Sequence, residues 1–228
     1  MCGRISLFAD EPTLVERFGA TPVRPITPRY NVAPSSEIPV ITNEEPERID
    51  QFRWGLVPPW ADDPKIGNRL INARSETVAD KPSFRDAFEA RRCLVLVDGF
   101  YEWQRRPDGN QPYRICRSDG EPFALAGLWE TWQNGEPLHT TTILTTEPND
   151  LMQPIHDRMP VVLAPDDERR WLTTADPDER HSLLVPASEP SLEAYPVSTA
   201  VNDPTAEGPA LLEEIDDVGG QTDLGEFS

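Results

Sequence analysis

The first four residues, Met-Cys-Gly-Arg, place a cysteine where its own α-amine can become free. Removal of Met1 would leave Cys2 with an amine and a thiol on adjacent carbon atoms. An α-amine has a pKa of ~7.7–8.0 and a free cysteine thiol a pKa of ~8.5, so both nucleophilic forms are accessible near neutral pH. The chain therefore offers a reactive 1,2-aminothiol. The alternative interpretation is that Cys2 is simply a small residue that follows the start codon. Other residues must distinguish these two interpretations.

Three further segments place polar residues where an apolar core is expected. INARSET contains Asn72 and Arg74 after two apolar residues, VDGFYEW contains Glu102 between aromatic residues, and PIHDRMPVVL contains His156 and Arg158 before an apolar run. A carboxylate among aromatic side chains loses hydration, which raises its pKa and makes it a usable acid or base. A structural alternative exists for each, because Glu102 could face solvent and a lone histidine is more often a surface or satisfied core residue.

Short β-rich runs and frequent turns indicate that these residues lie on an antiparallel β-core. The runs RCLVLVDGFYEW, EPFALAGLWETW and TTTILTTEP are separated by turn sequences such as PDG, SDG and NG. Short helical patterns predict helices over about 11–20, 83–92, 149–156, 166–174 and 176–184, with Ser83 as the N-cap of the second. No repeat and no dinucleotide-binding or phosphate-loop glycine pattern occurs.

The 228 residues fit one domain with a tail. We expect residues 2–204 to form the domain and the acidic residues 205–228 to form a flexible tail around one apolar patch, ALLEEI. There is no long apolar run and no secretory signal, so we expect a soluble, cytoplasmic protein without a membrane span. Cys93 and Cys116 lie in apolar stretches and are expected to be reduced core residues.

The charge balance is strongly acidic, with a formal net charge of −19 and lysine only at positions 65 and 81. The acidic residues concentrate in the C-terminal third. A lysine-poor, acidic surface is typical of proteins from a salt-rich cytoplasm, where screening suppresses self-repulsion. The alternative is an ordinary acidic protein with an acidic tail. Charge alone disfavours nucleic-acid binding, because proteins that bind nucleic acids normally display a basic face.

A series of motifs resembles, in order and spacing, the SRAP (SOS-response-associated peptidase) family: MCGR, RYNVAPSS, WGLVPPW, INARSET, GFYEW, IHDRMP and YPVSTAVND. They span Cys2 to Asp203. The resemblance implies a single compact α+β domain with a curved, barrel-like antiparallel β-core and short helices packed outside. It also implies a chromosome-associated, monomeric protein that senses abasic sites in single-stranded DNA and joins itself covalently to them, without a metal or cofactor.

The resemblance assigns roles to individual residues. The Cys2 amine would attack the ring-opened aldehyde of an abasic site, and the Cys2 thiol would then close a thiazolidine ring. Glu102 would take a proton from the amine and help to open the sugar, and His156 would protonate or bind the released sugar oxygen. Asn72 would hold Cys2 and the sugar by hydrogen bonds. The expected DNA contacts are phosphate contacts from Arg4, Arg74, Arg85 and Arg158, and apolar wedges from Trp60 and Pro34, for which core packing is the alternative.

The strongly negative net charge lowers the expected non-specific affinity for DNA but is compatible with a local arginine-lined groove.

Three other functions stay open. The first is a cysteine peptidase that uses Cys2 and cuts only its own Met1 from the chain. The second is an N-terminal-nucleophile amidohydrolase that releases ammonia from glutamine, although no glutamine-site motif appears downstream. The third is a non-covalent single-strand-binding module, which would have no use for a cysteine at the N-terminus.

Overall fold

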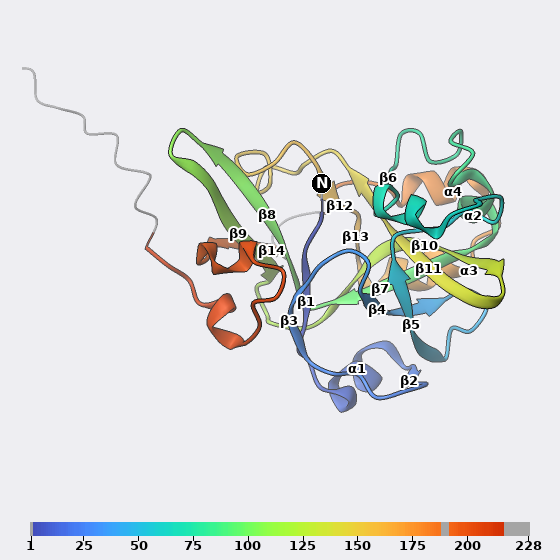
Figure 1. The fold of residues 1–228 in the computed structure, drawn as a ribbon, viewed down its shortest axis with the longest axis horizontal. Helices are drawn as coiled ribbons and strands as arrows, with labels where there is room; N and C mark the ends of the chain where they lie inside the picture. The colour runs from blue at the N-terminus through green and yellow to red at the C-terminus, as the bar shows by residue number, and fades with distance from the viewer. Residues whose placement is uncertain (1, 188–191, 217–228) are drawn as a thin grey trace, which may run out of the picture.

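The computed structural model describes residues 2–187 and 192–216 (Figure 1). The strands are β1 (Ile5–Leu7), β2 (Thr21–Pro22), β3 (Arg29–Val32), β4 (Glu37–Thr42), β5 (Arg48–Trp54), β6 (Asn72–Arg74), β7 (Arg92–Val97), β8 (Gly99–Arg106), β9 (Gly109–Arg117), β10 (Phe123–Asn134), β11 (Glu136–Thr146), β12 (Met159–Pro160), β13 (Val162–Leu163) and β14 (Leu192–Pro196). The helices are α1 (Glu11–Phe18), α2 (Arg85–Ala90), α3 (Pro165–Thr173), α4 (Pro177–Ser182) and the 3₁₀ turns η1 (Pro64–Arg69), η2 (Thr199–Asn202) and η3 (Pro209–Leu212).

The centre of the fold is a closed ring of strands. β5, β4, β7, β10 and β11 pair in this order through antiparallel ladders, and β11 then pairs in parallel with β5, with Thr140 opposite Arg53 and Thr141 opposite Trp54. Closure leaves these strands without an open edge. The expected α+β fold with a curved, barrel-like core is therefore confirmed, and the parallel pair that closes the ring is an addition to the expected antiparallel pattern.

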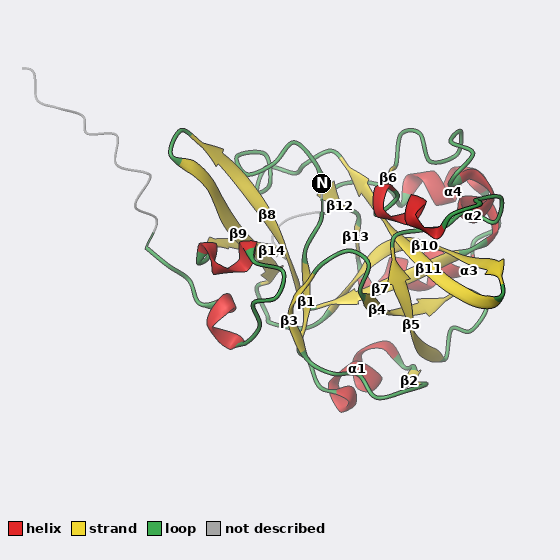
Figure 2. Ribbon diagram, in the orientation of Figure 1, coloured by secondary structure: helices red, strands yellow, loops and turns green. Residues whose placement is uncertain are grey.

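A second sheet lies beside the ring, with the strand order β14-β9-β8-β1-β3. β1 lies inside this sheet, because Ile5 pairs with Val32 on one side and with Phe100 on the other. The N-terminus consequently lies between the two sheets, as the position of its marker in Figure 1 shows. Figure 2 shows α2, α3 and α4 gathered on the ring side of the molecule, away from β8 and β9.

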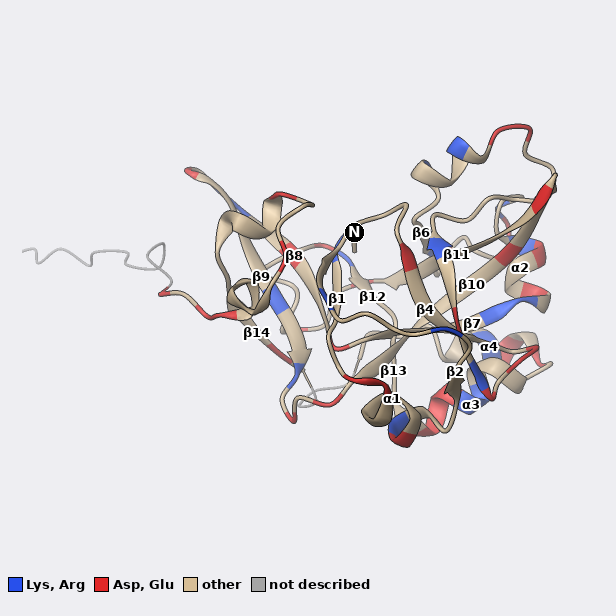
Figure 3. Ribbon diagram, turned by 60° about the horizontal axis from the view of Figure 1, so that its bottom comes forward, with Lys and Arg blue, Asp and Glu red and all other residues tan. Residues whose placement is uncertain are grey.

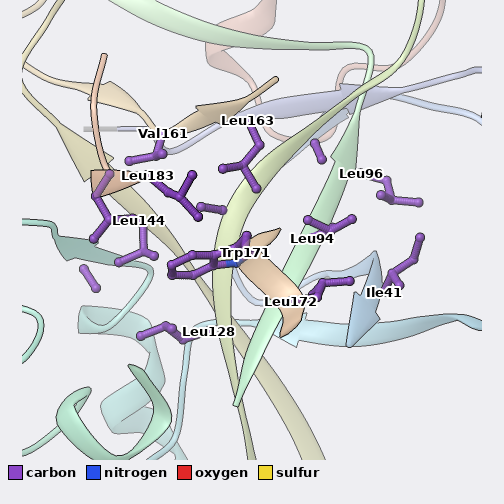
Figure 4. Packing of buried hydrophobic residues seen from close by; sticks show 14 of the residues in the cluster. Ile41, Leu94, Leu96, Leu128, Leu144, Val161, Leu163, Trp171, Leu172 and Leu183 are labelled. Atoms are coloured by element: carbon purple, nitrogen blue, oxygen red, sulfur yellow. The ribbon is translucent and has the colours of Figure 1, made fainter. Parts of the chain in front are cut away.

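Large apolar side chains around Trp171 of α3, which is fully buried, form a core between the ring and the helices (Figure 4). Leu128, Leu144 and Leu183 belong to the same cluster. The Trp171 indole Nε1 donates a hydrogen bond to the Cys93 carbonyl at 3.0 Å, which satisfies its polar atom inside the core. α3 is thereby anchored to β7 by both packing and a directed bond.

The cysteines behave as expected from their apolar surroundings. Cys2, Cys93 and Cys116 are all buried and carry free thiols. The prediction that Cys93 and Cys116 are reduced core residues is confirmed.

Four of the five expected helices form, and two expectations, the N-cap of the second helix and the helix over 149–156, are wrong. α1, α3 and α4 match the predicted segments. α2 begins at Arg85, and Ser83 is not its N-cap: the Phe84 and Arg85 amides both donate to the Lys81 carbonyl, so a backbone turn starts this helix. Within the expected segment 149–156, residues 150–155 form turns, because Pro154 lacks the amide hydrogen that a continuing helix needs.

Residues 205–216 differ from the expected flexible tail. Leu211, from the apolar patch of this segment, is only 5% exposed and packs with Tyr101, Val197 and Val201. Val197 also forms a β-bridge with Glu214. The apolar patch therefore anchors the segment, and the remaining tail residues, 217–228, lie outside the described part of the chain.

None of the helices within residues 2–187 and 192–216 is long and apolar enough to cross a lipid bilayer.

A close contact between two glycines joins the end of β5 to η1. A Cβ atom built on Gly55 would lie 2.6 Å from the Gly67 carbonyl oxygen, and one built on Gly67 would lie 2.5 Å from the Gly55 carbonyl oxygen. Gly55 also adopts a φ of +127°, which side-chain-bearing residues rarely adopt. This contact fixes the path of the chain that leads to β6.

We expect Gly55→Ala to lower the free energy of unfolding by ~3 kcal/mol, because it adds both backbone strain and a clash with a carbonyl group. Gly109→Ala is the matched control, since Gly109 has a φ of +132° with nothing within 4 Å of its added Cβ. That variant should cost only ~1 kcal/mol. Urea denaturation measures both, and equal losses would contradict the steric role of Gly55.

Candidate functional site

The site begins at Cys2, which is fully buried just before β1. The Asn72 side-chain Nδ2 donates a hydrogen bond to the Cys2 carbonyl at 2.7 Å. The Asn72 Oδ1 is buried and has no hydrogen-bond partner within the described residues. Because the Asn72 Nδ2 is engaged and its Oδ1 is not, the Oδ1 can accept a hydrogen bond from an amine or hydroxyl group brought to Cys2.

The position of Asn72 follows from strand pairing. Asn72 begins β6 and lies opposite Ile143 of β11. The residue before it is fixed by the indole of Trp54, whose Nε1 donates to the Ile71 carbonyl at 2.9 Å. Trp54 opens the WGLVPPW motif but was not among the residues expected at the site, because nothing in that motif indicates which backbone group the indole bonds.

Glu102 lies on β8 opposite Tyr113, and only 2% of its side chain is exposed. Burial raises the pKa of this carboxyl group, and nearby positive charge, including that of His156, lowers it in part. The prediction of a desolvated carboxyl among aromatic residues is confirmed. Such a group keeps its proton to higher pH than an exposed glutamate and can act as acid and as base.

His156 lies at the mouth of the site, with 24% of its side chain exposed and its Nε2 3.9 Å from the Glu102 Oε2. The Arg158 amide donates to the His156 Nδ1 at 3.0 Å. Asp157 Oδ1 also lies 3.0 Å from the same Nδ1, so this nitrogen either accepts from the amide or, when protonated, donates to Asp157. The imidazole therefore lies between the carboxylates of Glu102 and Asp157.

The Cys2 thiol is held in its protonated form. Burial raises the pKa of the Cys2 thiol, and the neighbouring Glu102 carboxylate raises it further. The sulfur has a weak contact with the Arg4 carbonyl at 4.0 Å. A thiol in this environment needs a base before it can act as a nucleophile. The residues expected to be catalytic, Cys2, Asn72, Glu102 and His156, thus come together from the N-terminal segment, β6, β8 and the turns before β12.

Two of the expected phosphate ligands are engaged with the protein itself. The Arg4 Nη1 donates to Asn31 Oδ1 at 2.7 Å and to the Val201 carbonyl at 2.6 Å. Arg158 forms a bidentate ion pair with Glu76 and donates a hydrogen bond to the Thr145 carbonyl at 2.6 Å. Only 13% of the Arg158 side chain is exposed.

Arg74 and Arg85 are exposed, and within residues 2–187 and 192–216 Arg85 pairs only with the adjacent Asp86, at 3.1 Å. These two guanidinium groups are accessible to a bound phosphate. Figure 3 shows basic and acidic residues interspersed along the ribbon of the described residues.

The expected apolar wedges lie on loops that are tied together. Trp60 is 58% exposed, in the turn that follows β5, and Pro34 lies in the turn before β4. Next to Pro34, Ser35 Oγ donates to Asn68 Oδ1 of η1 at 3.0 Å, and the same oxygen accepts from Arg53 Nη2 at 3.1 Å. The sequence analysis missed Asn68, because a single asparagine in a loop carries no distinguishing pattern.

A cavity of about 550 Å³ opens beside His156. Its lining includes Trp103, Arg105 and Ile155. Sequence reasoning stopped at Glu102 and missed the tryptophan and the exposed arginine that follow it on β8. The alternation of the sequence GFYEWQRR was the available signal, because it places Trp103 and Arg105 on the same face of the strand.

No group of three or more histidine, cysteine, aspartate or glutamate side chains within residues 2–187 and 192–216 is arranged to hold a metal ion.

Residues 1–204 match the profile of the family described as SOS response associated peptidase (SRAP). The chain is 46% identical to the abasic site processing protein YoqW of Bacillus subtilis strain 168, over 93% of this chain and 99% of YoqW. It is 34% identical to the abasic site processing protein HMCES of Gallus gallus, over 83% of this chain and 67% of HMCES.

Solved structures have the same fold. The crystal structure of a protein from Bacteroides thetaiotaomicron superposes with a TM-score of 0.87 at 28% identity, over 94% of this chain and all of that protein. A protein from Bordetella bronchiseptica gives a TM-score of 0.77 at 29% identity, over 86% of this chain.

Glu102→Gln is expected to stabilise the protein at neutral pH. Because burial raises the pKa of Glu102 in the folded state, the native protein binds this proton more tightly than the unfolded chain does. Stability from this group is therefore present at low pH and is lost as the pH rises through the folded-state pKa. The Tm of the variant should exceed that of the wild type at pH 7, and the difference should disappear below the unfolded pKa of ~4.3.

Thermal unfolding over a pH series measures this difference. Glu136→Gln, at an exposed position, is the control and should show no such pH dependence. A lower Tm for Glu102→Gln at pH 7 would contradict the cost that burial places on the charged form.

Proposed function

The chain belongs to the SOS response associated peptidase (SRAP) family, and from this premise we propose that it recognises abasic sites in single-stranded DNA and joins itself to them covalently through Cys2. One observation carries the proposal: the buried Glu102 carboxyl lies beside Cys2, whose backbone is held by Asn72. The similar proteins from Bacillus subtilis and Gallus gallus are named abasic site processing proteins.

The proposed reaction uses both nucleophiles of Cys2. Removal of Met1 frees the amine, which adds to the aldehyde carbon of the ring-opened sugar, and loss of water gives an imine. The thiol then adds across the carbon–nitrogen double bond. Sulfur bonds to carbon, the thiol proton passes to nitrogen, and a five-membered thiazolidine ring results. The DNA strand is not cut, so the lesion is shielded.

The neighbouring groups supply the proton transfers. Glu102 takes a proton from the amine as base and returns one to the departing water as acid, a double role that its raised pKa supports. His156 reaches the sugar oxygen released on ring opening, because its imidazole lies at the open end of the site. The open Oδ1 of Asn72 accepts a hydrogen bond from the sugar or from the attacking amine.

The raised pKa of the Cys2 thiol supports an amine-first order over a reaction that begins with a thiolate. A cysteine peptidase requires a thiolate nucleophile near neutral pH, and burial together with the Glu102 carboxylate disfavours that form. We therefore limit the proposed peptidase activity to removal of Met1.

The strand would bind across the loops that surround Cys2. Arg74 and Arg85 present exposed guanidinium groups for phosphate contacts. Trp60 and Pro34 would separate the bases next to the lesion, and the cavity beside His156 would hold the neighbouring nucleotide. With a net charge of −19, non-specific binding should be weak, so the covalent step supplies most of the retention.

Cys2→Ala is expected to abolish the heat-stable adduct with an abasic single-stranded oligonucleotide, because both the ring sulfur and the ring closure are lost. Cys2→Ser keeps the amine and should give an adduct only when borohydride reduces the imine. Cys116→Ala is the matched control and should crosslink like the wild type. Denaturing gel electrophoresis measures all three, and a heat-stable adduct in Cys2→Ala would refute the proposal.

A chain that keeps Met1, or carries an uncleaved N-terminal tag, should give no adduct although its thiol is intact. Mass spectrometry establishes the processing state of each sample before the assay. An adduct formed by the amine-blocked chain would instead indicate direct attack by the thiol.

Arg74→Ala is expected to weaken binding to intact single strands and to reduce the slope of log affinity against log salt by ~0.7, the value for one lost phosphate contact. Arg158→Ala should lower the Tm and leave this slope unchanged, because its guanidinium is bound to Glu76 and Thr145. Fluorescence anisotropy over a salt series separates the two effects. A reduced slope in Arg158→Ala alone would reverse the assignment.

A further inference from the structure

A pocket of about 560 Å³ lies between the C-terminal ends of α2 and α3 and the helix α4. Figures 1 and 2 show these three helices on the ring side of the molecule. Two arginines from different elements line it, Arg92 at the start of β7 and Arg180 in α4. Arg92 is only 4% exposed and Arg180 only 6%. Two positive charges are thus buried side by side.

Neither guanidinium group forms an ion pair with a carboxylate of the described residues. Buried charges are normally paired, and this chain contains 40 acidic residues that could supply a partner. Glu179, the neighbour of Arg180, bonds instead to Thr174 and to Arg170. Burial lowers the pKa of Arg92, and the charge of Arg180 lowers it further, which reflects their mutual repulsion.

The donors of Arg92 are already used. They bond to the backbone carbonyls of Phe88, Glu89, Trp171, Leu172 and Thr174. These carbonyls lie at the ends of α2 and α3, where helix dipoles are negative and offset part of the charge. Arg92 therefore contributes positive potential to the pocket but no free hydrogen-bond donor.

The donors of Arg180 are poorly used. Its Nη1 has only long contacts, 3.4 Å to the Glu89 carbonyl and 3.3 Å to the Ala175 carbonyl. Its Nε is buried and has no partner within residues 2–187 and 192–216. The guanidinium plane is held over the Phe88 ring, with its central carbon 5.7 Å from the ring centroid. A rigidly held guanidinium group with unused N–H donors is the arrangement that binds oxyanions.

We propose that this pocket is a binding site for a phosphate-type oxyanion, with Arg180 as its direct ligand and Arg92 as a second positive charge. The anion would satisfy the free donors and reduce the repulsion between the two arginines. The exposed carboxylate of Glu89 lines the same pocket and opposes the anion. Arg85 begins the helix that ends at this pocket, so the phosphate group could come from a DNA backbone or from a free anion.

The test uses the full chain with Cys2→Ala, so that covalent chemistry plays no part. Sodium phosphate is compared with sodium chloride at equal ionic strength, by thermal unfolding and by calorimetric titration. Phosphate should raise the Tm above its value in chloride, and Arg180→Met should weaken phosphate binding at least about ten-fold. Methionine keeps an apolar stem over Phe88. Arg180→Lys keeps the charge but loses the planar guanidinium, so it should bind phosphate with intermediate affinity. It replaces the methionine variant in the test if that variant fails to fold.

Two further variants sharpen the result. Glu89→Gln should tighten phosphate binding a few-fold, because it removes the opposing charge at the rim. Arg170→Met, at a half-exposed arginine outside the pocket lining, should bind phosphate like the parent. An equal Tm rise in phosphate for the parent and Arg180→Met, or an equal effect of chloride, would overturn the proposal.

Competition with an intact single-stranded oligonucleotide identifies the source of the phosphate group. If phosphate displaces the oligonucleotide and Arg180→Met removes this competition, the pocket lies on the DNA path. If phosphate binds without affecting the oligonucleotide, the ligand is a free anion. Both results support the oxyanion site and differ only in what supplies its ligand.

Discussion

One edge of β11 controls the geometry of the whole molecule. The strand pairs first with β5, which closes the ring, and a few residues later with β6, which places Asn72 beside Cys2. The chain between β5 and β6 must therefore leave that edge and return to it over a short span. The contact between Gly55 and Gly67 permits this, because any side chain at either position would push η1 away from the ring. Ring closure and site assembly thus depend on the same hydrogen-bonding edge.

The site itself is held at an energetic cost. A carboxyl group that is 2% exposed would be more stable in water, and burial also keeps the Cys2 thiol protonated. The surrounding sheets impose this arrangement, since β1 and β8 are adjacent strands with Ile5 opposite Phe100. Proteins commonly accept such local instability where groups must exchange protons. The well-packed core around Trp171, between the ring and the helices, supplies the stability that the site lacks.

Local sequence signals predicted those parts of the fold that depend on neighbouring residues. α1 lies within the segment 11–20 that the helical pattern predicted, and Glu102 was identified from the aromatic residues beside it. Contacts between distant residues could not be predicted in this way. Arg158 was expected to meet phosphate, but its ion pair with Glu76 spans 82 positions, and no pattern in either segment indicates the other. Residue type alone showed which groups carry charge but not which partner each one meets.

The two ends of the domain are joined through Arg4. Its side chain donates to the Val201 carbonyl, 197 residues later, and Asn31 bonds the same carbonyl together with those of Asp203 and Ala206. A ribosome makes the N-terminus first and this closing segment last. During synthesis, therefore, the N-terminal segment emerges well before the residues that hold it in place. The hydrogen bonds of Arg4 and Asn31 to the closing segment can form only after almost the entire domain has been made.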